Sequence, residues 1–248
     1  KNVYQKLIDD NVSLVYGFPN GNSIYGFVKK LDWHILDPVP FLIKPLKSKY
    51  FTNKFMFLRF LPNINLYLST NSNKNNFSLI QENHFPKEVN KLWQKFSKNI
   101  LVSVDRNKDY LDWRYIRKPN ENYKIINCYD ANNNYKGFIV FCVKVKHEGK
   151  IGYIMDLIYD LNSPKVGKLL LKFANTYIQN QNADCILSWC MEHSPNYSVF
   201  RSESYYNMPE RLRPIELHFG VRALDNKNKN IITKRENWYI SYSDSDTV

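Results

Sequence analysis

The chain has 248 residues, of which 44% are hydrophobic and 15% aromatic, and this composition excludes a disordered protein because a core can form. The 11 prolines and 8 glycines are too few for a fibrous or linker-rich protein. The formal net charge of +12 favours a general solubility charge or attraction of an anionic cofactor or sugar nucleotide. No nucleic-acid partner is expected, because no RNA-binding, zinc-finger or helix-turn-helix motif accompanies the basic residues.

The first third of the chain alternates helix and strand patterns. Residues 1–9 and 23–31 carry apolar side chains at helical spacing, and residues 12–18 are apolar and aromatic enough for a strand. Residues 34–46 are rich in strand-forming types but contain three prolines, which is typical of sheet edges and connections. Residues 50–69 are expected to add a closing strand with turns.

A polar, asparagine-rich break at residues 71–76 is the best linker candidate. It predicts two domains, residues 1–76 and residues 77–248. Because the chain begins at Lys1 and not at a methionine, we expect residues upstream of Lys1 to be missing.

The second domain is predicted around a strand, a helix and a strand at residues 151–159, 165–181 and 185–190. Pro164 suits the first turn of the helix, and apolar residues recur along one helical face. A connection of this length joins parallel strands and directs the helix N-terminus, with its free N–H groups, toward the end of the first strand. The domain reads α-α-β-β-β-α-β-α-β-β, the other elements being residues 85–96, 109–117, 123–129, 135–146, 195–203, 217–224 and 238–242.

The cysteines, histidines and apolar runs indicate where such a chain would work. The four cysteines lie in strand-like segments without metal-ligand spacing, so we expect free, buried thiols in a reducing, cytoplasmic compartment, with disulfides as the alternative. The histidines form no ligand grouping, so no metal is expected. No apolar run reaches the roughly 20 residues that a membrane span needs, and no charged-then-apolar leader opens the chain.

Three phrases stand out beside this order of elements: Asp-Tyr-Leu-Asp-Trp-Arg-Tyr at 109–115, Tyr-Gly-Phe-Pro-Asn at 16–20 with Leu-Asp-Trp at 31–33, and Trp-Tyr-Ile at 238–240. The order of elements resembles the GNAT superfamily of acyl-CoA N-acyltransferases. The phrases are similar to tandem GNAT-like proteins of bacterial cell-surface sugar and polysaccharide synthesis. The resemblance implies an α+β fold of two GNAT-like lobes, with mixed sheets flanked by helices and the first lobe incomplete.

The same resemblance implies a function. The expected reaction is transfer of an acyl group from acetyl-CoA or another acyl-CoA to a small-molecule amine, such as a nucleotide-linked amino sugar. The alternative is a catalytically degenerate GNAT-like binding module in a polysaccharide biosynthesis system. The oligomeric state is not readable from the sequence.

The cofactor would lie at the N-terminus of the 165–181 helix. The family's glycine-rich phosphate loop keeps one glycine position here, Gly167, while Lys165 and Lys168 would bring charge to the phosphates. The alternative is an ordinary solvated first turn of a helix. The residues that the resemblance assigns to the cofactor are Leu157, Ile158, Lys165, Val166, Gly167, Lys168 and Asn196.

The general acid of the family is a tyrosine four residues before a Gly-Phe pair. Ser204-Tyr205 is the counterpart of that pair, which places Phe200 in the tyrosine position, and Val28 stands four before Asp32-Trp33 in the first lobe. Loss of the tyrosine does not exclude acyl transfer, because a thiol of pKa about 8.5 needs little acid help to leave.

Proton acceptors and acceptor-binding residues remain. Asp156 on the first parallel strand, or Glu192 and His193 after the second, could take the proton of the amine. The alternative for Asp156 is a carboxylate tied to backbone N–H groups. Trp113 and Arg114 could bind a nucleotide diphosphate and Tyr25 could face an interlobe cleft, although core packing is favoured for Trp113 and Tyr25.

Overall fold

The computed structural model describes residues 2–48, 62, 65–66, 76–119, 121–147 and 149–248. It confirms the predicted α+β fold with a mixed sheet flanked by helices. The expected linker at 71–76 and the closing strand at 50–69 lie almost wholly outside these residues.

The chain forms two compact units, each built from separate segments. The first unit comprises Lys1–Pro40, Ile100–Ser103 and Pro209–Tyr239. The second unit comprises Phe41–Asn99, Val104–Met208 and Ile240–Val248. The division into residues 1–76 and 77–248 stays a prediction about how the two halves arose.

Among the described residues, the second unit holds a sheet of seven strands, in which only one pair of neighbouring strands is parallel. That pair is β7 and β8, as the strand–helix–strand pattern predicts, since the connection runs through a helix. Every other neighbouring pair is antiparallel. The order is β4 (Phe77–Gln81), β5 (Lys124–Asp130), β6 (Tyr135–Lys146), β7 (Gly149–Tyr159), β8 (Cys185–Trp189), β3 (Phe41–Pro45) and β9 (Tyr206–Asn207).

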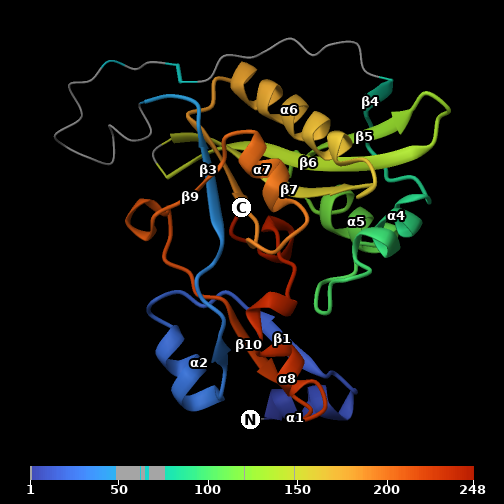
Figure 1. Cartoon of the computed structure of the whole chain (residues 1–248). Helices are drawn as coiled ribbons and strands as arrows, with labels where there is room; N and C mark the ends of the chain where they lie inside the picture. The colour runs from blue at the N-terminus through green and yellow to red at the C-terminus, as the bar shows by residue number, and fades with distance from the viewer. Residues whose placement is uncertain (1, 49–61, 63–64, 67–75, 120, 148) are drawn as a thin grey trace. The chain divides into compact units, whose positions relative to one another are not determined.

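Helices cover both faces of this sheet (Figure 1). The long helix α6 (Pro164–Asn180) lies on one face beside α7 (Tyr197–Ser202). On the other face lie α4 (Val89–Phe96) and α5 (Lys108–Leu111), which continues into a π-helical turn, Asp112–Ile116. The predicted apolar face of α4 is buried as expected, namely Val89, Leu92, Trp93 and Phe96.

The first unit is a smaller sheet with helices α1 (Asn2–Asp9), α2 (Ile24–Leu31) and α8 (Lys229–Ile232). Its strand order is β1, β10, β2, so the middle strand comes from the far end of the chain. Strand β10 runs antiparallel to both neighbours, and Leu14 pairs with Ala223. The bounds are Leu14–Gly17 for β1, Gly220–Ala223 for β10 and His34–Ile35 for β2.

The two sheets share a local plan. In the first unit β1, α2 and β2 follow one another and β10 is inserted between the strands; in the second, β8, α7 and β9 follow one another and β3 is inserted. A residue in the left-handed conformation follows each helix, Asp32 at φ 55° and Ser204 at φ 62°. These are the positions matched to the family's Gly-Phe pair, and glycine suits that conformation best.

Several predicted details are wrong. Residues 238–242 form no strand, because Trp238 makes only an isolated bridge to Val102. Ser241 then caps a short 3₁₀ turn, Tyr242–Asp244, in which the Asp244 carboxylate accepts from the Ser241 N–H at 2.8 Å. Strands β4 and β9 and helix α8 were not predicted. All four cysteines are free and buried, as expected.

Candidate functional site

The parallel strands β7 and β8 separate partway along their length. They pair from Ile151–Cys185 to Ile154–Ser188, whereas β7 continues against β6 as far as Tyr159. The register with β6 shifts at this point, so that Met155 is an extra residue and forms a β-bulge. Beyond the bulge, no described strand pairs with the β8 side of β7, which leaves backbone groups open to another partner.

Side chains from the segment before α7 reach this open edge. The Asn196 side-chain amide donates to the Leu157 carbonyl at 2.8 Å, and the Tyr159 hydroxyl donates to the Pro195 carbonyl at 3.1 Å. Leu157, Ile158 and Asn196 are all buried. The opening therefore has an amide hydrogen bond at its centre, of the kind that an extended, amide-containing ligand would make.

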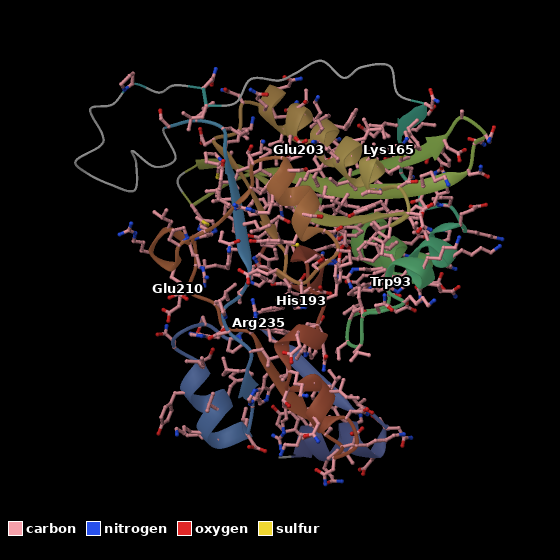
Figure 2. The ribbon with its side chains drawn as sticks, in the orientation of Figure 1. Trp93, Lys165, His193, Glu203, Glu210 and Arg235 are labelled. Atoms are coloured by element: carbon pink, nitrogen blue, oxygen red, sulfur yellow. The ribbon has the colours of Figure 1, made fainter. Side chains whose placement is uncertain are left out.

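The N-terminus of α6 lies at the same end of the sheet as the end of β7. Lys165 and Lys168 are exposed on its first turn, and Figure 2 shows Lys165 on the α6 side of the sheet with Trp93 on the opposite side. The Lys165 ammonium lies 5.4 Å from the Phe77 ring centroid. The Lys168 ammonium lies 3.9 Å from a Glu203 carboxylate oxygen, so one of the two cations is partly neutralised.

The space beside Gly167 is filled by the Tyr159 ring and is not an open groove. A Cβ at this position would lie 2.6 Å from the Tyr159 ring, so the glycine lets the ring pack against the helix. Val166 is also buried. The turn therefore offers a phosphate no glycine-lined hollow, and the Val166 N–H already donates to the Ser163 carbonyl at 2.8 Å.

Asp156 lies in a buried ion pair on the opposite face of the sheet. Arg106 Nε donates to Oδ1 at 3.1 Å, Ser241 Oγ donates to the same oxygen at 2.8 Å, and the Tyr115 hydroxyl donates to Oδ2 at 2.9 Å. Arg106 also pairs with Asp244 at 2.7 Å. The partners of Asp156 are thus side chains and not the expected backbone N–H groups.

Burial shapes the protonation of this network. Desolvation raises the pKa of the Asp244 carboxyl, although the Arg106 guanidinium opposes the rise. Burial, with the charge of Asp156, raises the pKa of Tyr115 well above its ordinary value. The arrangement holds charge out of water, and a proton acceptor for a diffusible amine needs the opposite, an accessible lone pair. The sequence carried no signal for Arg106, which stands in no motif.

The other predicted acid–base residues lie on the segment that follows β8. Glu192 and His193 are exposed, and Glu192 accepts from the Asn207 side-chain amide at 3.0 Å. Phe200 is buried and packs edge-on against Tyr205 at 5.0 Å between ring centroids. The predicted tyrosine position therefore presents a hydrocarbon ring, which offers no proton.

The predicted acceptor-binding residues do not share one surface. Trp113 is 60% exposed and Tyr25 is 67% exposed, so the favoured core packing of both is wrong. Arg114 is buried and donates to the carbonyls of Ser243 and Ser245 at 2.9 and 2.8 Å. Its guanidinium therefore binds backbone carbonyls of the C-terminal segment and forms no nucleotide site with Trp113.

Sequence reasoning missed a buried lysine on β3. Lys44 donates to the Glu203 carbonyl and lies 5.7 Å from the Tyr205 ring centroid. Burial lowers the pKa of Lys44 to about 8, although the Glu203 carboxylate opposes the shift. The lysine joins the inserted strand to the end of α7, and its position in an otherwise apolar strand, Phe-Leu-Ile-Lys, was the available signal.

Metal-ligand groups and membrane-spanning helices were sought in the described residues. Within them, no group of three or more His, Cys, Asp or Glu side chains is arranged to hold a metal ion. None of the helices in this part of the chain has the length and apolar character needed to cross a membrane.

No protein-family model and no curated protein matches the chain. Solved structures do match. A GCN5-related N-acetyltransferase from Anabaena variabilis has 13% identity and a TM-score of 0.55 over 94% of this chain and 51% of its own. Saccharomyces cerevisiae N-myristoyltransferase with bound myristoyl-CoA has 10% identity and a TM-score of 0.52 over 88% of this chain and 56% of its own.

A conserved Enterococcus faecalis protein described as a probable N-acyltransferase has 10% identity and a TM-score of 0.53. It is matched over 90% of this chain and 48% of its own. The chain thus spans about half the length of these structures. At these identities the likeness establishes the fold, which is that of the GCN5-related acyltransferases.

Proposed function

We propose that the protein transfers an acyl group from acetyl-CoA or another acyl-CoA to an amine. The observation that carries the proposal is that the pairing of β7 with β8 ends at Ile154–Ser188, beyond which β7 continues to Tyr159 and leads into helix α6. An opening between parallel strands beside a helix N-terminus suits a ligand with an extended amide chain and a diphosphate. The likeness to acyltransferases supports this reading at the level of fold.

The residues of the second unit would divide the binding between them. Acyl-CoA would supply the activated thioester carbonyl. The Leu157 carbonyl, next to Ile158, would accept a ligand N–H in the place now taken by the Asn196 amide. The phosphates would be held by the ammonium groups of Lys165 and Lys168 and by the N–H groups of the turn that contains Val166 and Gly167, apart from that of Val166, which donates to Ser163.

Positioning would supply most of the catalysis. With Phe200 in the tyrosine position, no strong acid protonates the leaving sulfur, and a thiol of pKa about 8.5 leaves without one. The amine must be neutral and close to the thioester carbon when it attacks. Among the proton acceptors expected on this unit, the exposed Glu192 and His193 are better placed than the ion-paired Asp156.

The acceptor that we propose is a nucleotide-linked amino sugar of surface polysaccharide synthesis, acylated in the cytoplasm. We further propose that residues 1–76 and 77–248 are two GNAT-like lobes. The shared plan of the two sheets supports a duplication, because a strand, a helix, a short strand and an inserted strand recur in one order.

Binding of acetyl-CoA, followed by thermal shift, tests the function. Reversing both charges in Lys165→Glu/Lys168→Glu should weaken binding about tenfold, because two phosphate contacts are lost. The matched control is Lys91→Glu/Lys95→Glu, which reverses two exposed lysines on α4 on the other face of the sheet. Equal affinities in both double variants would remove the cofactor from α6. Mass spectrometry of glucosamine incubated with acetyl-CoA would then report transfer.

A second function is favoured by one observation. The Asp156 carboxylate is fully engaged with Arg106, Ser241 and Tyr115, and Phe200 offers no proton, so neither of these two described residues supplies acid–base catalysis. A degenerate binding module in a polysaccharide system would have this character. Acetyl-CoA binding without transfer to any amine, or sugar binding without acetyl-CoA binding, would favour that module over the enzyme.

A further inference from the structure

A histidine and an aspartate meet in the first unit, 181 residues apart in sequence. Asp37 follows β2 and His218 precedes β10, and the antiparallel pairing of these strands places the two side chains together. His218 Nδ1 shares a hydrogen bond with Asp37 Oδ2. The other oxygen, Oδ1, accepts from the Phe219 N–H at 2.8 Å, so the carboxylate is fixed from two sides.

The second ring nitrogen of His218 faces another carboxylate, which is itself largely exposed. Nε2 lies 3.5 Å from Oε1 of Glu216. The His218 side chain is 23% exposed, and that of Glu216 is 74% exposed. An imidazole oriented by a carboxylate at one nitrogen, with the other accessible, is the arrangement that enzymes use for a general base.

This pair borders a cavity of about 350 Å³ that lies wholly within the first unit. The cavity has the size of a small-molecule site. Its lining residues are Asp37, Glu210, Arg213, Ile215, Glu216, Leu217 and His218.

The cavity is acidic although the whole chain carries a net charge of +12. Arg213 contacts Glu210 at 3.5 Å, and this pair largely cancels. Asp37 and Glu216 remain as the charges that face the imidazole, since the other lining residues, Ile215 and Leu217, are apolar. The site therefore favours a cation, and in particular a small ammonium group.

The turn that precedes helix α2 lies beside Glu216 and His218. The His218 N–H donates to the Pro19 carbonyl at 2.9 Å, which fixes the turn against the strand. A Cβ on Gly21 would lie 2.6 Å from a Glu216 carboxylate oxygen, so the turn approaches this carboxylate as closely as glycine allows.

We propose that this cavity binds a primary amine as its ammonium ion and that His218, oriented by Asp37, is the residue that takes its proton. The proposal rests on the proposed N-acyltransferase function. The ammonium group pairs with Glu216 and gives one proton to Nε2 of His218. The ligand thereby becomes a neutral, nucleophilic amine. The neutral amine then carries the lone pair that acyl transfer requires, and His218 releases the proton to water.

The electrostatics agree with such a role. Burial alone would lower the pKa of His218, but hydrogen bonds and charge from Asp37 and Glu216 outweigh it and raise the pKa above 6.5. A base of this strength accepts a proton near neutral pH, and the nearby Arg213 is held by Glu210.

The test follows the His218 imidazole by NMR in the intact chain, with the signal assigned by its loss in His218→Gln. The probes are methylammonium and glucosamine, and N-acetylglucosamine is the matched sugar without an ammonium group. We expect both amines to shift the signal saturably and to lower the pKa of His218, because a cation beside the ring disfavours the imidazolium. N-Acetylglucosamine should leave it unchanged.

Two variants locate the cation. Glu216→Gln should weaken amine binding at least fivefold, whereas Glu236→Gln, which removes an exposed carboxylate outside the cavity, should not. Absence of a shift with either amine, or an equal loss in both variants, would overturn the site.

Kinetics separate this inference from the proposed function. If acyl transfer is detected, His218→Gln should lower kcat/KM by roughly 10²-fold and abolish its rise with pH. Asp37→Asn, which removes the negative charge, should move that rise to lower pH. If His218→Gln does not change the rate of acyl transfer, the role of His218 is refuted, whereas the proposed acyltransferase activity is not. An amine-dependent shift of His218 in a protein without transfer would keep the site and refute the enzyme.

Discussion

Several charged side chains of this protein are buried at positions where an apolar side chain would be expected. Lys44 is 2% exposed in a strand whose other buried side chains are apolar. Arg106 and Asp156 are buried together against the sheet. Such groups cost free energy to desolvate, so each makes stability depend on a partner.

Lys44 should make stability rise with pH. Its pKa is about 8 in the folded chain against 10.5 for the ordinary group, so the unfolded state binds more protons between these values. The Lys44 contribution to the unfolding free energy should therefore increase from about pH 8 to pH 10.5, by up to about 3 kcal/mol. The buried thiols of Cys128, Cys142 and Cys190, whose pKa burial raises to about 12, lower the total over the same range, so the test is a comparison of variants. In denaturant titrations the difference in unfolding free energy between wild type and Lys44→Met should change by this amount across the range, whereas the difference for Lys29→Met, an exposed control, should stay constant.

Asp156→Asn should act on stability before it acts on chemistry. The change leaves Arg106 with one carboxylate partner, Asp244, and breaking a buried pair typically costs about 3–5 kcal/mol. Urea unfolding should show that loss, while Asp246→Asn, at a carboxylate 87% exposed, should lie within about 0.5 kcal/mol of the wild type. Unchanged stability combined with abolished acyl transfer would restore Asp156 as the base.

At the level of elements, long amphipathic patterns were predictable and short or exchanged pieces were not. Helix α4 followed from its spaced apolar residues, and parallel β7 and β8 followed from the helix between them. Strand β9 has two residues, too few for a periodicity. Strand β3 was recognisable as a strand, but nothing local indicates that it pairs with β8. The Asp37–His218 pair could not be predicted either, because nothing local indicates that β2 pairs with β10.

The contact between α6 and β7 depends on glycine. A Cβ on Gly152 would lie 2.4 Å from the Ile178 side chain, so Gly152→Ala should force the helix away and cost about 1–3 kcal/mol. Gly26→Ala is the control, because nothing lies within 4 Å of its Cβ position on helix α2. That change should stabilise by about 0.5–1 kcal/mol. Thermal unfolding of both variants tests this. If both substitutions change the stability in the same direction, the packing described is contradicted.

At the scale of the whole molecule, each unit depends on a strand from the other half of the chain. Strand β3 lies between β8 and β9, and β10 lies between β1 and β2. The units are therefore not separable at one point in the sequence, even if two lobes arose by duplication.

Residues 77–248 alone should fail to unfold cooperatively. This fragment lacks β3, so β8 would lose its antiparallel partner and five residue pairs. Circular dichroism during urea titration should show a broad transition, where the full chain gives a sharp one. A fragment of residues 37–248, which retains β3, is the control. A sharp transition in the shorter fragment would show that the strand exchange is dispensable.

The position of β10 also fixes when the first unit can be completed during synthesis. Leu14 leaves the ribosome about 200 residues before its partner Ala223, so β1 and β2 must wait while the seven-stranded sheet is translated. During that interval both strands present unpaired backbone edges, which are the sites where chains associate with one another. The β1 and β2 segments are thus made long before their sheet can be completed, and a slowly translated 210–223 segment would prolong their exposure.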